Sequence, residues 1–78
     1  MKRGSLIQKS LPHGNLNLYD GIRDDEEPHE TGESLFHNEF GLILETYHGT
    51  GNHVYHRILT PRNHIGWIHD FHIEEIPQ

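Results

Sequence analysis

Short runs in which apolar and polar residues alternate, separated by clusters of turn-forming residues, fill most of the chain. Leu16 and Leu18 alternate with polar neighbours, so both leucines share one face of a predicted strand over 16–19. An opening strand is predicted over 4–9 and ends at the turn cluster 12–15. No segment has the apolar spacing of an amphipathic helix. The pattern therefore predicts an all-β protein.

The strongest predicted strand covers 40–47, which is rich in aliphatic and aromatic residues, and Leu42 and Leu44 are expected to face the core. A hairpin turn is predicted over 49–52, and 53–60 returns as the next strand. Two registers are open for this strand, because a shift by one residue exchanges its two faces. Either Val54, His56 and Ile58 face inward, or Tyr55, Arg57 and Leu59 do.

The C-terminal part of the chain predicts a turn over 61–64, a strand over 65–69, a one-turn 3-10 helix over 70–72 and a closing strand over 73–76. Gly66 marks a place where a neighbouring backbone is expected to come close. Short strands at this spacing, without a helix, predict a small barrel of five to six strands.

A long acidic loop is predicted over 20–39, where apolar residues nearly vanish. Eight acidic residues and one arginine give this segment a net charge of −7, against −6 for the whole chain. Such a loop is unusual in a compact domain unless it is functional or partly ordered as a hairpin. It is interpreted as a solvated loop, a docking surface for a Lys- or Arg-rich protein, or a cation site. Its densest run is Asp24, Asp25, Glu26 and Glu27, followed by Pro28.

The length of 78 residues predicts a single domain over 1–78 with a thin core and no room for a deep catalytic cavity. The absence of cysteine excludes disulfides and thiolate metal sites. The sequence also has no nucleophile elbow and no glycine-rich phosphate loop. We therefore expect a protein that is not an enzyme, without catalytic residues and without a cofactor.

Only six lysines and arginines occur, too few for the positive surface that phosphate-backbone binding requires. Aromatic residues such as Phe40, Tyr47 and Phe71 are expected to build the core and its rim rather than a base-stacking platform. No apolar stretch approaches the roughly 20 residues of a membrane span, and no signal-peptide core follows the basic start. We expect no nucleic-acid or membrane partner, and a cytoplasmic or virus-particle location.

The tail of the chain carries two short motifs, Leu59–Thr60–Pro61 and then Gly66–Trp67–Ile68. Together with the order of strands, polar loop, hairpin and helical turn, they resemble the SH3-like (Src-homology-3-like) barrel of bacterial and bacteriophage type over residues 4–76. The resemblance implies an all-β, five- to six-stranded barrel with one long acidic loop and a 3-10 turn before the last strand. It also implies that Gly66 lets its strand bend, that Trp67 covers an open end or edge, and that Ile68 fills the interior.

Eukaryotic members of this family bind proline-rich peptides in an aromatic groove beside an acidic loop. Tyr19 and Asp20 match the first tyrosine and the aspartate of the family signature Ala-Leu-Tyr-Asp-Tyr, and Gly21 stands where its second tyrosine would be. The proline and tyrosine of the family's final turn fall on His69 and His72. These departures argue against recognition of a proline helix.

Nine histidines are present, and neutral imidazole is a common metal ligand. His53 and His56 form one pair at a spacing of three, and His69 and His72 form another. In a 3-10 turn, residues three apart point the same way. His69 and His72 are therefore the candidates for a metal site, but no such site is assigned, because pairs lack the further ligands that metals need. The alternative is that these histidines are exposed polar side chains.

These features together predict a non-catalytic interaction module that binds a basic or mixed protein partner through its acidic loop and a modified groove. A structural protein that forms a homo-oligomer or a phage-particle component is the alternative, and a histidine-based metal or pH-responsive module is the second alternative. The residues expected to contact the partner are Tyr19, Asp20, Asp24, Asp25, Glu26, Glu27, Tyr55, Trp67, His69 and His72.

Overall fold

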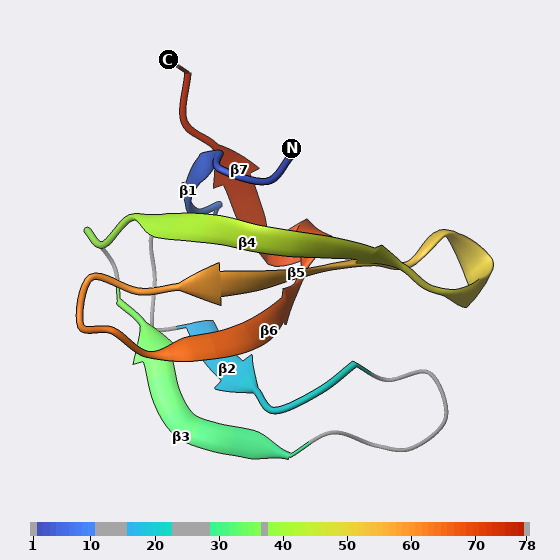
Figure 1. Ribbon diagram of the computed structural model, residues 1–78, viewed down its shortest axis with the longest axis horizontal. Helices are drawn as coiled ribbons and strands as arrows, with labels where there is room; N and C mark the ends of the chain where they lie inside the picture. Colours follow the sequence, from blue (N-terminus) through green and yellow to red (C-terminus); the bar gives the residue numbers. More distant parts are fainter. Residues whose placement is uncertain (1, 11–15, 23–28, 37, 78) are drawn as a thin grey trace.

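A computed structural model of the chain describes residues 2–10, 16–22, 29–36 and 38–77. These residues form one antiparallel sheet that curls into an open half-barrel (Figure 1), in the order β3-β2-β6-β5-β4-β1-β7. The all-β prediction is confirmed, with seven strands in place of five or six. The strands are β1 (Leu6–Lys9), β2 (Leu16–Tyr19), β3 (Glu30–Leu35), β4 (Gly41–His48), β5 (Val54–Leu59), β6 (Ile65–His69) and β7 (Ile73–Glu75).

Two 3-10 turns interrupt the strands, η1 (Thr50–Asn52) in the β4–β5 hairpin and η2 (Asp70–His72) between β6 and β7. The second confirms the predicted helical turn before the last strand. In the part of the chain that the structure describes, no helix has the length and apolar character needed to cross a membrane.

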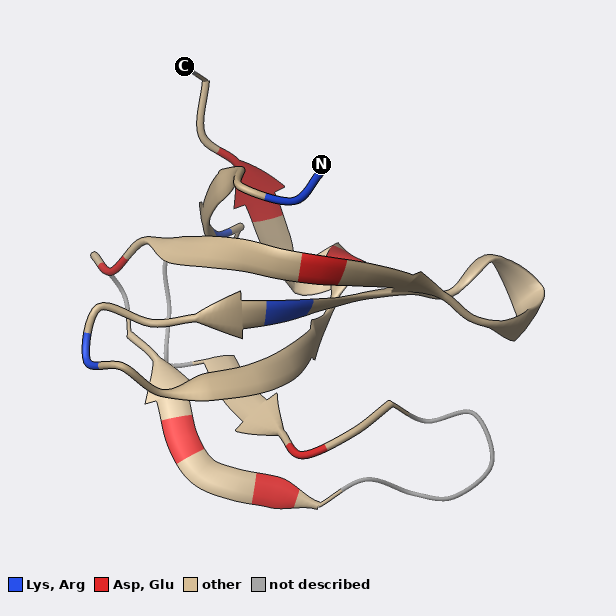
Figure 2. Cartoon of the chain, viewed as in Figure 1, with Lys and Arg blue, Asp and Glu red and all other residues tan. Residues whose placement is uncertain are grey.

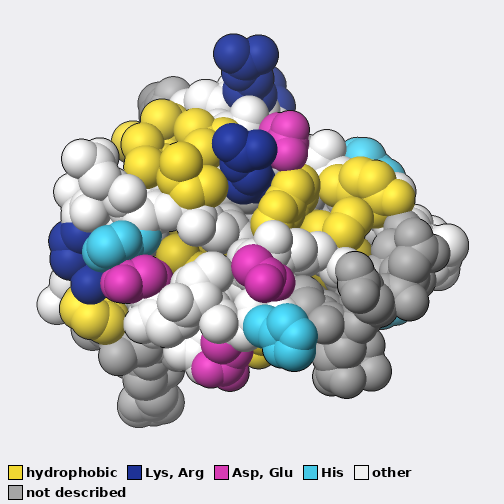
Figure 3. Space-filling view, turned by 60° about the horizontal axis from the view of Figure 1, so that its bottom comes forward, with side chains coloured by type: hydrophobic (Ala, Val, Ile, Leu, Met, Phe, Trp, Pro, Cys, Tyr) yellow, Lys and Arg dark blue, Asp and Glu magenta, His cyan; other side chains and the backbone are white. Residues whose placement is uncertain are grey.

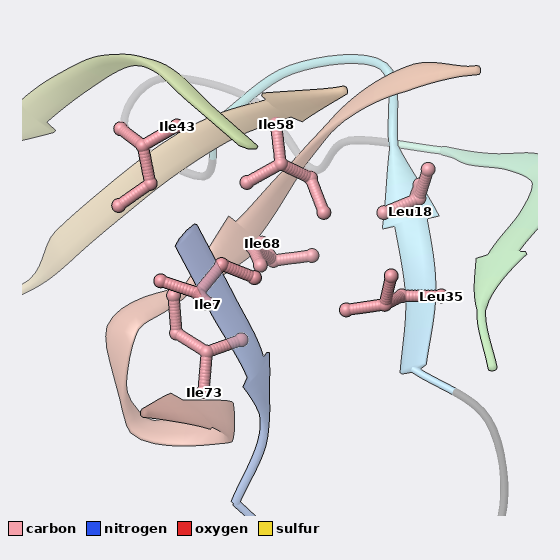
Figure 4. Packing of buried hydrophobic residues seen from close by; sticks show 7 residues of the cluster. All are labelled: Ile7, Leu18, Leu35, Ile43, Ile58, Ile68 and Ile73. Carbon is pink, nitrogen blue, oxygen red and sulfur yellow. The ribbon is translucent and has the colours of Figure 1, made fainter. Parts of the chain in front are cut away.

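The core is aliphatic, and each of the seven strands contributes one buried side chain to it. Figure 4 shows these side chains pointing into a shared interior. Burying such a side chain contributes roughly 1.5–3 kcal/mol to stability. With one such side chain from each strand the core is thin, as the chain length predicts. The expectation that aromatic residues build the core is wrong, because Phe40 is 52% and Phe71 79% exposed. The core residues are Ile7, Leu18, Leu35, Ile43, Ile58, Ile68 and Ile73.

The strand β3 lies inside the segment that was expected to be a loop. It pairs antiparallel with β2, with Leu35 opposite Leu16 and Ser34 opposite Asn17. The loop prediction is therefore corrected for 30–35, where the hairpin alternative holds. An edge strand needs few apolar residues, because one face and one edge meet solvent, and the fully buried Leu35 is its anchor. The run Asp24, Asp25, Glu26 and Glu27 lies outside the described residues.

The strand β4 faces the core with the opposite phase from the one expected. Ile43 is 1% exposed, whereas Leu42 and Leu44 are half-buried, so the prediction for the two leucines is wrong. Gly41 also faces inward, and a Cβ at Gly41 would lie 3.0 Å from Ile7 Cδ1. The pairing of β4 with β5 shifts after Ile43. Such a bulge moves the later residues of the strand by one position relative to their partners.

Strand β5 takes the first of the two predicted registers. Ile58 and His56 are buried, and Val54 is half-buried. Alternation along β6 likewise buries Gly66 and Ile68. The close neighbour of Gly66 is a side chain rather than a backbone, since a Cβ there would lie 2.5 Å from Leu18 Cβ.

Candidate interaction groove

Alternation along β5 and β6 places aromatic side chains on the outer face of the sheet. Because His56 and Ile68 point inward, Tyr55, Trp67 and His69 point outward. Tyr55 lies opposite His69 in the ladder, and Trp67 lies opposite Tyr19 of β2 on its other side. The pairing of three strands therefore gathers four ring-bearing side chains on one surface.

This surface is hollowed into an open groove of about 510 Å³, a volume within the range of ligand-binding sites. The groove collects five of the residues that the sequence predicted as partner contacts. It also includes His53 and Thr50 from the β4–β5 hairpin, which the sequence pattern did not assign to the site. Only the folded hairpin brings them beside η2, so no local signal marked them. The five predicted residues in the groove are Tyr19, Tyr55, Trp67, His69 and His72.

Asp20, another predicted contact residue, lies beside the groove rather than in it. It lines a smaller depression of about 220 Å³ together with Tyr19, Trp67 and Arg57. Its carboxylate accepts a hydrogen bond from the His29 N–H over 3.0 Å. Asp20 therefore places a negative charge next to the groove, on a depression that shares two rings with it.

His69 is the centre of a cluster of rings at one end of the groove. The Phe71 ring stacks on it at 4.8 Å between centroids, and Tyr55 meets it edge-on at 5.0 Å. His53 and His72 approach at 5.3 and 6.2 Å. Since Phe71 is 79% exposed, it presents a large apolar surface at this end of the groove. Such rings are typical of protein-binding surfaces.

Hydrogen bonds fix the orientation of the His69 ring. The Phe71 N–H donates to His69 Nδ1 over 3.2 Å, and His69 Nε2 lies 3.0 Å from His53 Nδ1. Burial lowers the pKa of His69 below its ordinary value of 6.5, and the neighbouring His53 and His72 lower it further. The carboxylate of Asp70 opposes this shift. The ring is therefore held in its neutral form.

A second histidine relay lies on the inner face of the sheet. His56 Nε2 donates to Asp70 Oδ1 over 2.6 Å, and His56 Nδ1 lies 2.9 Å from Thr46 Oγ1. A hydroxyl, an imidazole and a carboxylate are the groups of a nucleophile, base and acid set. However, none of these three side chains lines the groove. The relay satisfies a histidine that is 1% exposed and ties β4, β5 and η2 together.

The histidines are candidate metal ligands by their chemistry. Within the described ranges, no group of three or more histidine, aspartate and glutamate side chains is arranged to hold a metal ion. Both ring nitrogens of His69 are already engaged, by Phe71 and by His53. We therefore identify no metal ligand among them.

Comparison of the chain with protein-family models, with curated proteins and with solved structures gives no significant match. The sheet order and its curl are compatible with a small β-barrel fold. The function has to be inferred from the groove itself.

Proposed function

We propose that this chain is a small, non-catalytic interaction module of the SH3-like type, whose groove binds an extended segment of a basic or mixed protein partner. The observation that carries this proposal is the gathering of Tyr19, Tyr55, Trp67, His69 and His72 around one groove. The aliphatic core does not use these rings, so they are available for contact with a partner. Tyrosine and tryptophan are the residues that most often dominate binding energy.

The charge of the surface supports a basic or mixed partner. The chain carries a net charge of −6. Figure 2 shows acidic residues on β3, β4 and β7, with few basic residues between them. Asp20 and the exposed Glu30 lie next to Tyr19, one following it in the chain and the other opposite it on β3. Negative potential at a groove steers positively charged partners toward it.

The apolar surface supports contacts of mixed character. Figure 3 shows hydrophobic side chains in several patches, separated by charged side chains and histidines, on one face of the molecule. A contact surface of this kind is typical of non-obligate interfaces, which are about as apolar as the rest of a protein surface. An extended segment with both lysine and aliphatic residues fits it better than a purely apolar one.

The test uses three decapeptides of equal length, one of alternating lysine and leucine, one of alternating glutamate and leucine, and one rich in proline. Trp67 is the single tryptophan and lines the groove, so its fluorescence reports binding. The lysine peptide should change it, and the glutamate and proline peptides should not. Backbone amide NMR shifts in β2, β5 and β6 should map the same surface.

The matched variants are Tyr55→Ala in the groove and Phe40→Ala outside it. Loss of a central aromatic contact typically costs 2 kcal/mol or more, which is about thirtyfold in affinity. Tyr55→Ala should weaken binding of the lysine peptide by about this factor, while Phe40→Ala, which removes a 52% exposed ring, should leave it unchanged. Equal affinities for both variants, or preference for the glutamate peptide, would contradict the proposal.

A further inference from the structure

One end of the groove is held by a chain of hydrogen bonds through two histidines. The Phe71 N–H donates to His69 Nδ1, and His69 Nε2 lies 3.0 Å from His53 Nδ1. The chain links η2 to the residue that follows η1, so it joins two segments that are 16 residues apart. Pairing of β5 with β6 brings these two segments side by side, since Tyr55, two residues after His53, lies opposite His69.

The donors in this chain fix where the protons are. A backbone N–H only donates, so His69 Nδ1 accepts and carries no proton. His69 is then neutral, its proton lies on Nε2, and this N–H donates to His53 Nδ1. His53 Nδ1 therefore carries no proton either, and His53 is neutral as well. The assignment follows from the hydrogen-bond network.

A proton added to the ring of His69 or of His53 breaks the chain of hydrogen bonds. On His69 it would sit on Nδ1 and face the Phe71 N–H. On His53 it would sit on Nδ1 and face the His69 Nε2–H. In both places an attractive contact becomes a repulsion between two N–H groups. The observed geometry is therefore compatible only with two neutral rings.

The groups around His69 shift its pKa in both directions. Burial and the imidazoles of His53, His72 and His56 disfavour a positive ring, and the Asp70 carboxylate favours one. The face of the stacked Phe71 ring also favours a cation. The net effect on the pKa of His69 is a decrease, with burial as the largest cause. The titratable side chains around His69 are His53, Tyr55, His56, Asp70 and His72, and Tyr19 lines the same groove from β2.

We propose that protons gate the groove: acidification breaks the His53–His69 chain, opens the end of the groove between η1 and η2, and releases a basic segment. This inference rests on the proposed function for its release step. Release follows because imidazolium rings at the groove repel lysine and arginine side chains, and because the Phe71 end of the groove loses its support. The opening step concerns the free protein and does not depend on a partner.

The opening step is tested on the free protein by NMR of the imidazole nitrogens at pH 7.5 and pH 5.5. At pH 7.5, His53 and His69 should both show the Nε2–H tautomer. At pH 5.5, this pattern should be lost, together with a shift of the Phe71 amide and a change in Trp67 fluorescence. His48→Gln, a change on the same hairpin but outside the groove, should leave all of these effects in place. A His69 ring that keeps its Nε2–H tautomer and its Phe71 contact at pH 5.5 would overturn the inference.

The release step is tested with the lysine–leucine decapeptide. A histidine with an ordinary pKa of about 6.5 favours the open state up to about tenfold at pH 5.5. The affinity of the wild-type protein should therefore fall between pH 7.5 and pH 5.5, by up to about tenfold. In His53→Gln, whose amide oxygen still accepts from His69 but does not titrate, the fall should be smaller, and in His48→Gln it should be unchanged.

The outcomes separate the two proposals. Equal falls in the wild-type protein and in His53→Gln would contradict proton gating while leaving the proposed function intact. No binding at pH 7.5 would contradict the proposed function and the release step. Loss of the histidine chain at pH 5.5 would still support the opening of the free groove.

Discussion

Single residues decide how closely the strands of this sheet approach one another. Gly66 on β6 lies under Leu18 of β2, and a Cβ at Gly66 would lie 2.5 Å from Leu18 Cβ. Leu18 is fully buried, and its Cβ is attached to the backbone, so it has little freedom to move away. The absence of a side chain at Gly66 is therefore a packing requirement of the β2–β6 contact, which brings Tyr19 and Trp67 of the groove together.

Gly66→Ala should destabilise the fold by about 1–3 kcal/mol, the usual cost of overpacking. Gly21→Ala is the matched control, since nothing lies within 4 Å of a Cβ at that position. It should change stability by less than about 0.5 kcal/mol. Denaturant unfolding measured by Trp67 fluorescence reports both values. Equal stabilities would show that β2 moves away without cost.

Arg62 connects elements that no backbone pairing joins directly. Its guanidinium donates to both carboxylate oxygens of Glu39 at 3.1 and 3.2 Å and to the Ser34 carbonyl, and it lies 4.0 Å over the Phe36 ring. The β5–β6 turn is thereby tied to the connection between β3 and β4. A hydrogen bond from the Phe36 N–H lowers the pKa of Glu39, burial opposes this, and Arg62 adds to the lowering.

Arg62→Lys should lower stability by about 1–2 kcal/mol, because an ammonium keeps the charge but not the forked geometry. Arg57→Lys is the control. The Glu45 pair of Arg57 is exposed, and its buried Nε has no hydrogen-bond partner among the described residues, so the change should be close to neutral. Denaturant unfolding gives the free energy of unfolding of both variants. A larger loss in Arg57→Lys would contradict this account of Arg62.

The same clamp predicts a pH dependence with a defined sign. Because the pKa of Glu39 is lowered in the folded state, the unfolded chain binds more protons at acidic pH. The contribution of Glu39 is complete above about pH 4.5 and is lost as the pH falls through its lowered pKa. Between pH 7 and pH 3.5, the free energy of unfolding should therefore decrease less in Glu39→Gln than in the wild-type protein, as measured by denaturant unfolding. An equal decrease in both proteins would contradict this role of Glu39.

At the scale of the whole molecule, the sheet formed by the described residues has two open edges, β3 and β7, and both carry features that discourage pairing between copies. At one edge, β3 has Glu30 and Glu33, a Gly32 with φ of +88°, and an irregular register with β2. At the other, β7 is three residues long and contains two glutamates. Short, acidic and irregular edges are the usual protection against edge-to-edge association. They count against the homo-oligomer alternative.

Light scattering should therefore show the mass of a single chain at every concentration. Replacing Glu30 and Glu33 together by threonine should raise self-association, because the edge loses its like charges. Glu45→Thr on the central strand β4 is the control and should stay monomeric. An oligomer of the wild-type protein that does not depend on concentration would favour an assembly role.

The sequence by itself determined the features that are encoded locally. Alternation located β2, the glycine and asparagine turn located the β4–β5 hairpin, and the spacing after Trp67 located η2 and β7. It also named five of the groove residues, because family-like motifs and alternation place rings on one face of neighbouring strands.

Tertiary structure decided the rest, because those features depend on partners distant in the chain. Strand β3 has one buried apolar side chain, Leu35, and forms a strand only because its backbone pairs with β2. The inward phase of β4 follows from Ile43 packing beside Ile58 of β5, and no period within 40–47 distinguishes it from the opposite phase. The meeting of His53 with His69 requires the hairpin and η2 to fold together. Alternation specifies that a segment has two faces, and only the packing of the other strands selects which face is buried.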